Sequence, residues 1–288
     1  MKARKFIVLA AMAMAVVALA LVGCSSGGSS SAAASGSAAS GSESAASAEA
    51  SGSAAAGDYT LITPGKLTIA TSPDYPPFEN LVDGEYVGLD IDIAKAVAEK
   101  LGLEPEFKTL QFDAIIPAIA AGGQADMGIS GFSVDPERAK EIDFTTKYYI
   151  DDQAVAAMKS GEITEANADE KLNSEDCIIA VQSGTTGEDY VQENYPKAKV
   201  QAYGNSTDAF AAMQSGQANA VCTNKAVVEK MIADAYQDAA IVKSIATGEE
   251  YAGVVSQDNV ALRQAIDAAI DELLADGTID QLIQKNMG

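Results

Sequence analysis

The sequence contains no histidine and no tryptophan, and only 19 of its 288 residues are lysine or arginine, against 41 aspartates and glutamates. The missing histidine argues against a metal site built on imidazole ligands, and no metal or other cofactor is expected. The formal net charge of −22 argues against nucleic-acid binding, which requires a basic surface. The chain has 288 residues, of which 48% are apolar, and is long enough for about two globular domains.

Cysteine is scarce as well, and the three present are Cys24, Cys177 and Cys222. An exported protein could join the last two in a disulfide. Cys177 opens one expected strand, whereas Cys222 lies near the end of another, so an offset of about four residues would separate them by over 10 Å in parallel neighbours. A disulfide needs Cα atoms within about 7 Å, so two buried thiols are expected.

The N-terminal segment has the pattern of an export signal, in which three basic residues precede an apolar run over residues 6–22. This signal, residues 1–24, ends in Leu-Val-Gly-Cys, which resembles a bacterial lipobox. We therefore expect Cys24 to carry a lipid; the alternative is an ordinary signal peptide whose cysteine is incidental. Residues 25–57 are almost wholly Ser, Gly and Ala and predict a flexible tether with a reach of roughly 30 Å.

From residue 58 onward, short apolar segments alternate with amphipathic ones. Residues 90–101, for example, place Ile93 and Val97 on one face, which predicts a helix that Gly102 ends. This alternation occurs twice and predicts parallel sheets in an α/β fold. Strands are expected at 67–70, 105–110, 126–129, 177–181, 200–203 and 218–223, and helices at 90–101, 112–121, 188–194, 207–214, 225–235 and within 257–287.

The stretch from Gly128 to Phe144 carries the strongest chemical signal. Small and hydroxyl-bearing residues, among them Ser130 and Ser133, precede an Asp-Pro pair that favours the start of a helix. Arg138 follows within the first turn, so hydroxyls, backbone N–H groups and a guanidinium would meet. A carboxylate suits this combination, because arginine binds it bidentately. The alternative is an ordinary strand-to-helix turn with a surface arginine.

Four motifs occur in a fixed order: TSPDYPPFE (71–79), VGLDIDIAKAVAEKLG (87–102), ISGFSVDPERAKEIDF (129–144) and VQSGTTGEDY (181–190). Through these motifs, the chain from Leu67 to Gly288 resembles the amino-acid-binding proteins of ABC importers, which are the polar amino acid group of extracellular solute-binding proteins, family 3. The C-terminal segment 272–285 is similar to that family too.

The resemblance implies a periplasmic-binding-protein-like fold of type II, with two α/β lobes joined by a two-strand hinge. The first lobe would span 58–151, the second 152–248, and 249–288 would return to the first. The chain would cross between the lobes near 149–154 and 247–252. These boundaries are expectations from the family, because composition does not locate a hinge.

The resemblance also implies a function. The chain would be an extracellular lipoprotein, anchored as a monomer to the outer face of the bacterial cell membrane. It would capture a small amino acid by hinge closure and deliver it to an ABC permease, and it would not be an enzyme. One alternative is a sensor or adhesin on the same fold. Another is a prephenate-type dehydratase, in which a carboxylate would have to replace histidine as the acid or base.

The candidate ligand-binding residues follow expected strands and are Ser72, Asp74, Tyr75, Phe112, Ser130, Gly131, Ser133, Arg138, Gln182, Thr185, Thr186 and Asn224. Position by position, the resemblance assigns the ligand carboxylate to Arg138, with help from Ser133 and the backbone just before it. Thr185 and Thr186 would bind the same carboxylate from the other lobe. Both threonines could also cap a helix, which is compatible with ligand contact.

The remaining roles concern the body of the ligand. Tyr75 and Phe112 would sandwich its aliphatic part, and Gln182 could contact its side chain. The alternative for the two aromatic residues is plain core packing, which is common for rings that follow apolar strands.

Two positions depart from the family pattern. The family usually has an aspartate where Asn224 stands, to accept the ligand's α-ammonium; an amide oxygen still accepts, but without charge. A zwitterion would bind more weakly, or the ligand would lack the ammonium. Ser72 replaces an acid often found in members that bind cationic side chains, although Asp74 and Glu79 lie nearby and could compensate. A neutral amino acid is therefore the expected ligand.

Overall fold

The structure is a computed structural model that describes residues 59–288, so the expected export signal, Cys24 and the whole tether lie outside the described residues. Along the described chain, strands and helices alternate as the sequence predicts. Hydrophobic side chains from both kinds of element form the buried clusters that hold them together.

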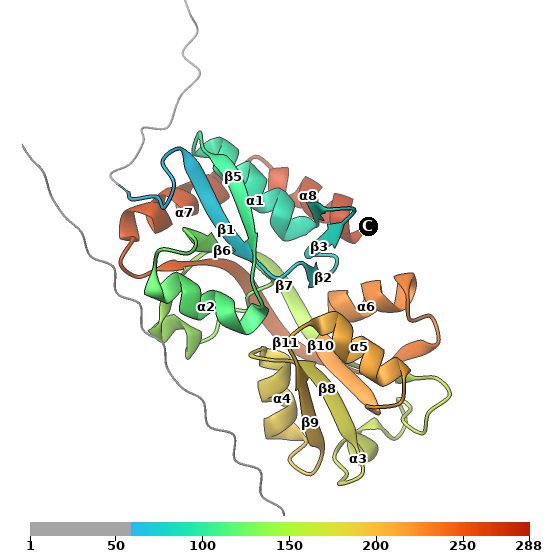
Figure 1. The fold of residues 1–288 in the computed structure, drawn as a ribbon. Helices are drawn as coiled ribbons and strands as arrows, with labels where there is room; N and C mark the ends of the chain where they lie inside the picture. The colour runs from blue at the N-terminus through green and yellow to red at the C-terminus, as the bar shows by residue number, and fades with distance from the viewer. Residues whose placement is uncertain (1–58) are drawn as a thin grey trace, which may run out of the picture. The chain divides into compact units, whose positions relative to one another are not determined.

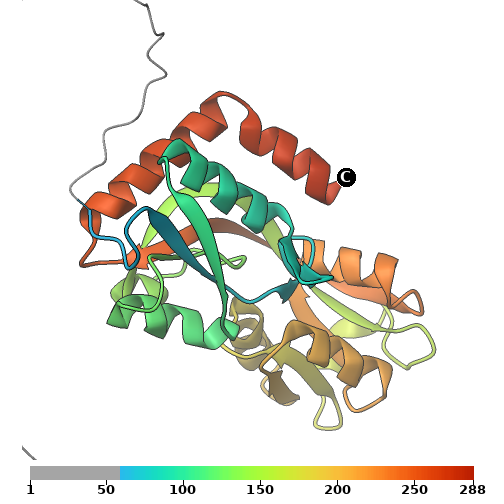
Figure 2. The same ribbon diagram turned by 45° about the horizontal axis from the view of Figure 1, so that its top comes forward.

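The first group of elements contains the parallel strands at the beginning of the described chain. Strand β1 (Lys66–Thr71) lies between β5 (Glu104–Thr109) and β6 (Met127–Gly128) and runs parallel to both. Four helices belong to this group: α1 (Leu89–Lys100), α2 (Phe112–Ala121), α7 (Val260–Ala275) and α8 (Thr278–Met287). Figure 2 shows α1, α7 and α8 packed together on one side of these strands and α2 on the other.

The second group repeats this arrangement with a second set of parallel strands. Strand β8 (Ile178–Gln182) lies between β9 (Lys199–Tyr203) and β10 (Ala220–Asn224) and runs parallel to both. Its helices are α3 (Ala168–Leu172), α4 (Thr186–Asn194), α5 (Ser206–Gln214) and α6 (Lys225–Asp234).

Two long antiparallel strands connect the groups. Strands β7 (Ile142–Met158, 17 residues) and β11 (Ala239–Ser256, 18 residues) pair with each other and pass from one group to the other, as Figure 1 shows. Because β11 also pairs with β6 and β7 pairs with β10, all eight strands form one sheet in the order β5-β1-β6-β11-β7-β10-β8-β9. We call the elements on the β6 side the first lobe and those on the β10 side the second lobe. The expected crossing segments, 149–154 and 247–252, lie on these two strands.

A small sheet follows β1 and carries part of the site. Its strands are β2 (Asp74–Tyr75), β3 (Glu79–Val82) and β4 (Glu85–Val87). Gly88 ends this sheet at φ 123°, where a Cβ atom would lie 2.2 Å from the carbonyl oxygen of Phe78. Only glycine therefore allows the chain to pass so close to β3 before α1 begins.

The structure corrects the expected helix after Asp135. The Asp135 side chain accepts hydrogen bonds from the backbone of Glu137 (2.8 Å) and Arg138 (3.1 Å), as the capping prediction requires. Only a single 3-10 turn, η1 (Arg138–Lys140), follows, because the chain enters strand β7 at Ile142 and leaves no room for an α-helix.

The cysteine prediction is confirmed. Cys177 and Cys222 are both buried and unpaired. Ala220 on β10 is level with Ile179 on β8, so Cys222 is level with Val181 and four residues beyond Cys177 along the parallel pair. At about 3.3 Å per residue, this offset is far beyond the reach of a disulfide.

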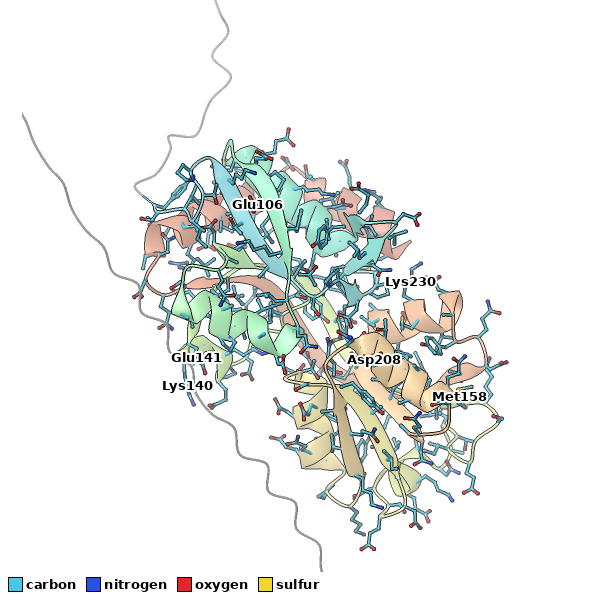
Figure 3. The ribbon with its side chains drawn as sticks, viewed as in Figure 1. Glu106, Lys140, Glu141, Met158, Asp208 and Lys230 are labelled. Atoms are coloured by element: carbon cyan, nitrogen blue, oxygen red, sulfur yellow. The ribbon has the colours of Figure 1, made fainter. Side chains whose placement is uncertain are left out.

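The surface of the described part is polar and charged. Figure 3 shows acidic and basic side chains projecting outward from both lobes, among them Glu106 on β5 and Lys230 on α6. Among residues 59–288, no helix is both long enough and apolar enough to cross a bilayer.

Candidate functional site

The structure brings most of the candidate residues to one small cavity between the lobes. Its volume is about 10 Å³, which is about the space for one water molecule. The lining side chains come from both lobes and are Tyr75, Phe112, Gly131, Ser133, Arg138, Gln182, Thr185, Thr186 and Asn224. Residues up to 149 positions apart in the sequence therefore meet here, and a larger guest requires the lobes to separate.

Arg138 lies at the boundary of the two lobes. Its Nη1 donates to the carbonyl oxygen of Ser133 at 2.9 Å, and its Nη2 donates to the carbonyl oxygen of Gly184 in the second lobe at 2.9 Å. A guanidinium has five N–H donors, so three remain for another acceptor. Burial lowers the pKa of the guanidinium, but acidic neighbours oppose this shift and an arginine stays charged.

Tyr75 and Phe112 both line the cavity, and their expected sandwich around a ligand stays a prediction. The ring of Phe112 lies 5.5 Å from the guanidinium carbon of Arg138 and stacks on Phe132, with ring centroids 4.7 Å apart. Tyr75 instead stacks on Phe78 at 6.2 Å. Phe112 therefore supports the arginine through a cation–π contact, while Tyr75 packs on the other side of the cavity.

Tyr75 also links the lobes through its hydroxyl group. The hydroxyl donates to Oδ1 of Asn224 at 2.7 Å and lies 2.7 Å from Oγ1 of Thr223, both on β10. Burial raises the pKa of Tyr75, so the hydroxyl keeps its proton and can donate. The amide oxygen of Asn224, which the sequence suggests as an acceptor for a ligand, is therefore already used in this closed arrangement.

Ser130 and Gly131 are each bonded to a buried carboxyl group. The hydroxyl of Ser130 donates to Glu79 at 2.7 Å and accepts from the backbone of Ser72 at 3.0 Å. The backbone N–H of Gly131 donates to Asp90 at 2.7 Å. In this arrangement these polar groups position the turn; the expected help of the backbone around Ser130 and Gly131 in binding a ligand stays a prediction.

The carboxyl groups of Glu79 and Asp90, which bond this turn, both have raised pKa values. Burial raises the pKa of Asp90 to about 6, although bonds from Gly131 and Tyr148 oppose the shift. Burial, together with the nearby charge of Asp90, raises the pKa of Glu79 well above its ordinary value. Neither group lines the cavity in this arrangement.

Ser72 and Asp74 do not line the cavity either. The Ser72 hydroxyl donates to Oδ1 of Asp74 at 2.8 Å. Oδ2 of Asp74 accepts from the backbone of Ser206, and the Ser206 hydroxyl donates to the carbonyl oxygen of Asp74 at 2.8 Å. Asp74 thus caps helix α5 of the second lobe, which is a contact between lobes that the sequence did not predict.

The second lobe contributes the start of helix α4. Thr185 accepts from the backbone of Glu188 at 3.1 Å and donates to the carbonyl oxygen of Gln182 at 2.8 Å, so it caps the helix as one alternative anticipated. The side chain of Gln182 donates to the carbonyl oxygen of Gly204 at 3.3 Å. The hydroxyl of Thr186, in contrast, donates a hydrogen bond to the side chain of a further residue.

That side chain is Glu249 on β11, which the sequence analysis missed. Its Oε2 accepts from Ser133, from Thr186 at 2.8 Å and from the amide nitrogen of Asn224 at 3.3 Å. Its Oε1 accepts from Gln153 on β7 at 2.9 Å. No local motif marks this residue; the one available signal was that Asn224 lacks the charge of the family's aspartate, which suggests an acid elsewhere.

Among the residues that the structure describes, no group of histidine, cysteine, aspartate and glutamate side chains is arranged to hold a metal ion. Arg138 is the charged residue that lines the cavity, and the carboxylate of Glu249 bonds three of the other lining residues, Ser133, Thr186 and Asn224. This pair of opposite charges between two lobes suits a small zwitterion better than an ion of one sign.

Sequence comparison finds relatives of the same kind. Residues 67–288 match the model of the bacterial extracellular solute-binding proteins, family 3. The chain is 32% identical to ABC transporter arginine-binding protein 1 of Escherichia coli (strain K12) over 75% of this chain and 88% of that protein. It is 31% identical to the ABC transporter glutamine-binding protein GlnH of Bacillus subtilis (strain 168), over 72% of this chain and 75% of the relative.

Solved structures agree. An ancestral arginine-binding protein bound to arginine superimposes with a TM-score of 0.72 at 34% identity, over 78% of this chain and 99% of the other. An ancestral amino-acid-binding protein described as a precursor of cyclohexadienyl dehydratase superimposes with a TM-score of 0.71 at 33% identity, over 78% and 96%. The expected periplasmic-binding-protein-like fold is thereby confirmed, and the chain belongs to the bacterial extracellular solute-binding proteins, family 3.

Proposed function

We propose that the protein captures a neutral amino acid between its lobes and delivers it to an ABC permease. The observation that carries this proposal is the position of Arg138, which bonds both lobes at once and keeps three N–H donors unused. An α-carboxylate bound by these donors would be gripped from both lobes. Binding would then favour the closed arrangement, because closure completes the set of contacts.

Entry of the amino acid requires the lobes to open. The cavity of about 10 Å³ is far smaller than any amino acid, and contacts such as Tyr75 to Asn224 and Asp74 to Ser206 bridge the lobes. The long strands β7 and β11 connect the lobes and are the hinge we propose. A permease can distinguish open from closed forms by the surface that the two lobes present together.

The preference for a neutral side chain rests on the acids near the site. Asp74, which could have compensated for Ser72, is instead occupied in capping helix α5. Arg138 and Glu249 would balance the two charges of a zwitterion, and the residues that line the cavity include no acid. A cationic amino acid, the ligand named for some relatives, would bring a third charge without a partner there.

We also propose that the protein is a lipoprotein attached through Cys24. The support is the Leu-Val-Gly-Cys sequence and the Ser-, Gly- and Ala-rich segment that follows it. A tether of roughly 30 Å reach would keep the binding lobes near a permease in the same membrane and raise their effective concentration there.

The structure offers one argument for the dehydratase alternative and one argument against it. Glu249 supplies a carboxyl group that bonds residues lining the cavity, and a catalytic acid or base could be such a group. A prephenate-type substrate, however, carries carboxylates and no ammonium, so Glu249 would repel it. Incubation with prephenate and detection of phenylpyruvate would reveal this activity; the proposed function predicts none above the uncatalysed rate.

The proposed function is tested by a thermal-shift screen against the common amino acids. A ligand at 100 times its dissociation constant adds about 2.7 kcal/mol to the free energy of unfolding, which gives a clear rise in the melting temperature. We expect a rise with one or a few neutral amino acids and a smaller one with lysine or arginine. The proposal fails if no amino acid raises the melting temperature at millimolar concentration.

A further inference from the structure

The side chain of Glu249, on a strand that connects the lobes, bonds residues that line the cavity. It is half-buried, and its two oxygens receive four hydrogen bonds, from Ser133 in the first lobe, Thr186 and Asn224 in the second, and Gln153 on β7. Two of these donors, Ser133 and Thr186, are hydroxyl groups that the family resemblance assigns to a ligand carboxylate. Glu249 therefore competes directly for groups of the proposed binding site.

Asn224 and Glu249 form a matched pair. The Asn224 amide directs its oxygen to Tyr75 at 2.7 Å and its nitrogen to Glu249 at 3.3 Å. An aspartate at position 224 would place a second carboxylate against Glu249, and two adjacent carboxylates repel each other. The asparagine is thus the residue that fits beside this glutamate, and the acid of the site lies on β11 instead of at the end of β10.

We propose that Glu249 accepts the α-ammonium of the bound amino acid, in place of the acid that position 224 lacks. This inference rests on the proposed function, because it requires an amino acid in the cleft. The ligand carboxylate would take the hydroxyls of Ser133 and Thr186 and the free donors of Arg138. Glu249 would keep its bonds to Gln153 and Asn224 and turn Oε2 to the ammonium, so that each charge of the zwitterion faces an opposite one.

The same arrangement makes Glu249 a specificity-determining residue. Without an ammonium between them, a ligand carboxylate and the Glu249 carboxylate would share one small cavity with a single guanidinium. An acid of the same shape that lacks the amino group should therefore bind much more weakly than the amino acid. The alternative is that Glu249 merely fills the closed cavity and must be displaced by any ligand.

The experiment compares L-glutamine with glutaramic acid, which is L-glutamine without its amino group. Calorimetry on the full-length protein, in detergent, gives the dissociation constants, and L-arginine with 5-guanidinopentanoic acid serves as the second pair. The variants are Glu249→Gln, the charge relocation Asn224→Asp with Glu249→Gln, and Glu250→Gln as a neighbouring control. Glu250 bonds Lys147 and not the residues around the cavity.

In Glu249→Gln a neutral acceptor replaces a charged one, so the affinity for the amino acid should fall about tenfold. The affinity for glutaramic acid should stay the same or rise. The preference for the amino acid therefore shrinks by about tenfold or more. The relocation variant should restore most of that preference, and Glu250→Gln should leave it unchanged within about threefold.

Three results would overturn the inference. Equal losses for both molecules of a pair would indicate that Glu249 only supports the fold, and equal gains would indicate that it only blocks the cavity. Failure of the relocation variant to recover any preference would exclude a role for the charge itself. If the wild-type protein binds no common amino acid, the proposed function fails together with this inference, whereas binding of an amino acid with an unchanged preference in the variants overturns this inference alone.

Discussion

Arg138 offers the sharpest test of how the two lobes share a ligand. In Arg138→Ala the side chain loses its bonds to the carbonyl oxygens of Ser133 and Gly184 and every donor proposed for the ligand carboxylate. Truncating one partner of such a charge-assisted pair costs about 2–5 kcal/mol, which corresponds to a loss of affinity of roughly 30- to 4,000-fold. Loss of the Gly184 bond adds to this, because it removes a contact that exists only when the lobes are closed.

Two further variants separate charge from geometry. Arg138→Lys keeps the positive charge but presents one ammonium in place of a planar fork, so we expect an intermediate loss of about tenfold. Arg263, the other arginine in the described part of the chain, pairs with Asp143 and Asp267 on the outside of the first lobe. Arg263→Ala should therefore leave the affinity unchanged within about threefold.

The assay is a calorimetric titration of each variant with the amino acid that stabilises the wild-type protein most. Circular dichroism beforehand establishes that the variants are folded. If Arg138→Ala loses less than threefold in affinity, Arg138 does not bind the carboxylate and the site has been placed wrongly.

Other properties of the chain lead to further predictions. Cys24→Ser should leave the protein unprocessed or release it from the membrane fraction of its native cell, and unchanged processing and partitioning would exclude a lipid at this residue. Burial raises the pKa of Asp151 from 3.8 to about 6, so the folded form loses stability relative to Asp151→Asn as pH rises through this range. Denaturant unfolding should then find the variant more stable by up to about 3 kcal/mol at pH 7 and no more stable near pH 4, whereas equal differences at both pH values would contradict the shift. Burial also raises the pKa of Cys177 to about 11 and of Cys222 to about 12, so neither thiol should react with maleimide at pH 7 until the protein is unfolded; rapid labelling of the native protein would contradict their burial.

The regular elements could be predicted because their signals are local. Residues 90–101 repeat apolar side chains at helical spacing, and the observed helix α1 covers Leu89–Lys100. Helix α2 was predicted in spite of Pro117 and is observed at Phe112–Ala121. The turn at Asp135 shows the limit of such signals. Its capping bonds are present, but the following chain is drawn into β7 by pairing with β11, a partner more than a hundred residues away.

Motifs placed several residues that the structure brings together, and charge placed fewer. Arg138, Ser133 and Thr186 each lie in a motif of the family, and all three line the cavity. Ser72 and Asp74 also lie in a motif, but Asp74 caps helix α5 of the second lobe and does not line the cavity. That contact spans 132 residues, and sequence spacing does not reveal it.

Glu249 is a residue near the site that sequence spacing also does not reveal. It lies in the sequence Thr-Gly-Glu-Glu-Tyr, which has the composition of an exposed turn, and its bond to Ser133 spans 116 residues. The observed β11 continues through this segment with a shift of register between Ile245 and Glu249. The three-dimensional pairing of β7 with β11 brings the carboxylate to the residues that line the cavity.

The proposed function requires that one amino acid bind between the lobes through its carboxylate. This is measured by titrating the wild-type protein with the amino acid that gives the largest thermal shift and, in parallel, with the amide derivative of the same amino acid. We expect a single saturable site for the amino acid and a loss of affinity of at least about 30-fold for the amide, because the amide has no charge for Arg138 to bind. Equal affinity for the two compounds, or no saturable binding by any amino acid, would contradict it.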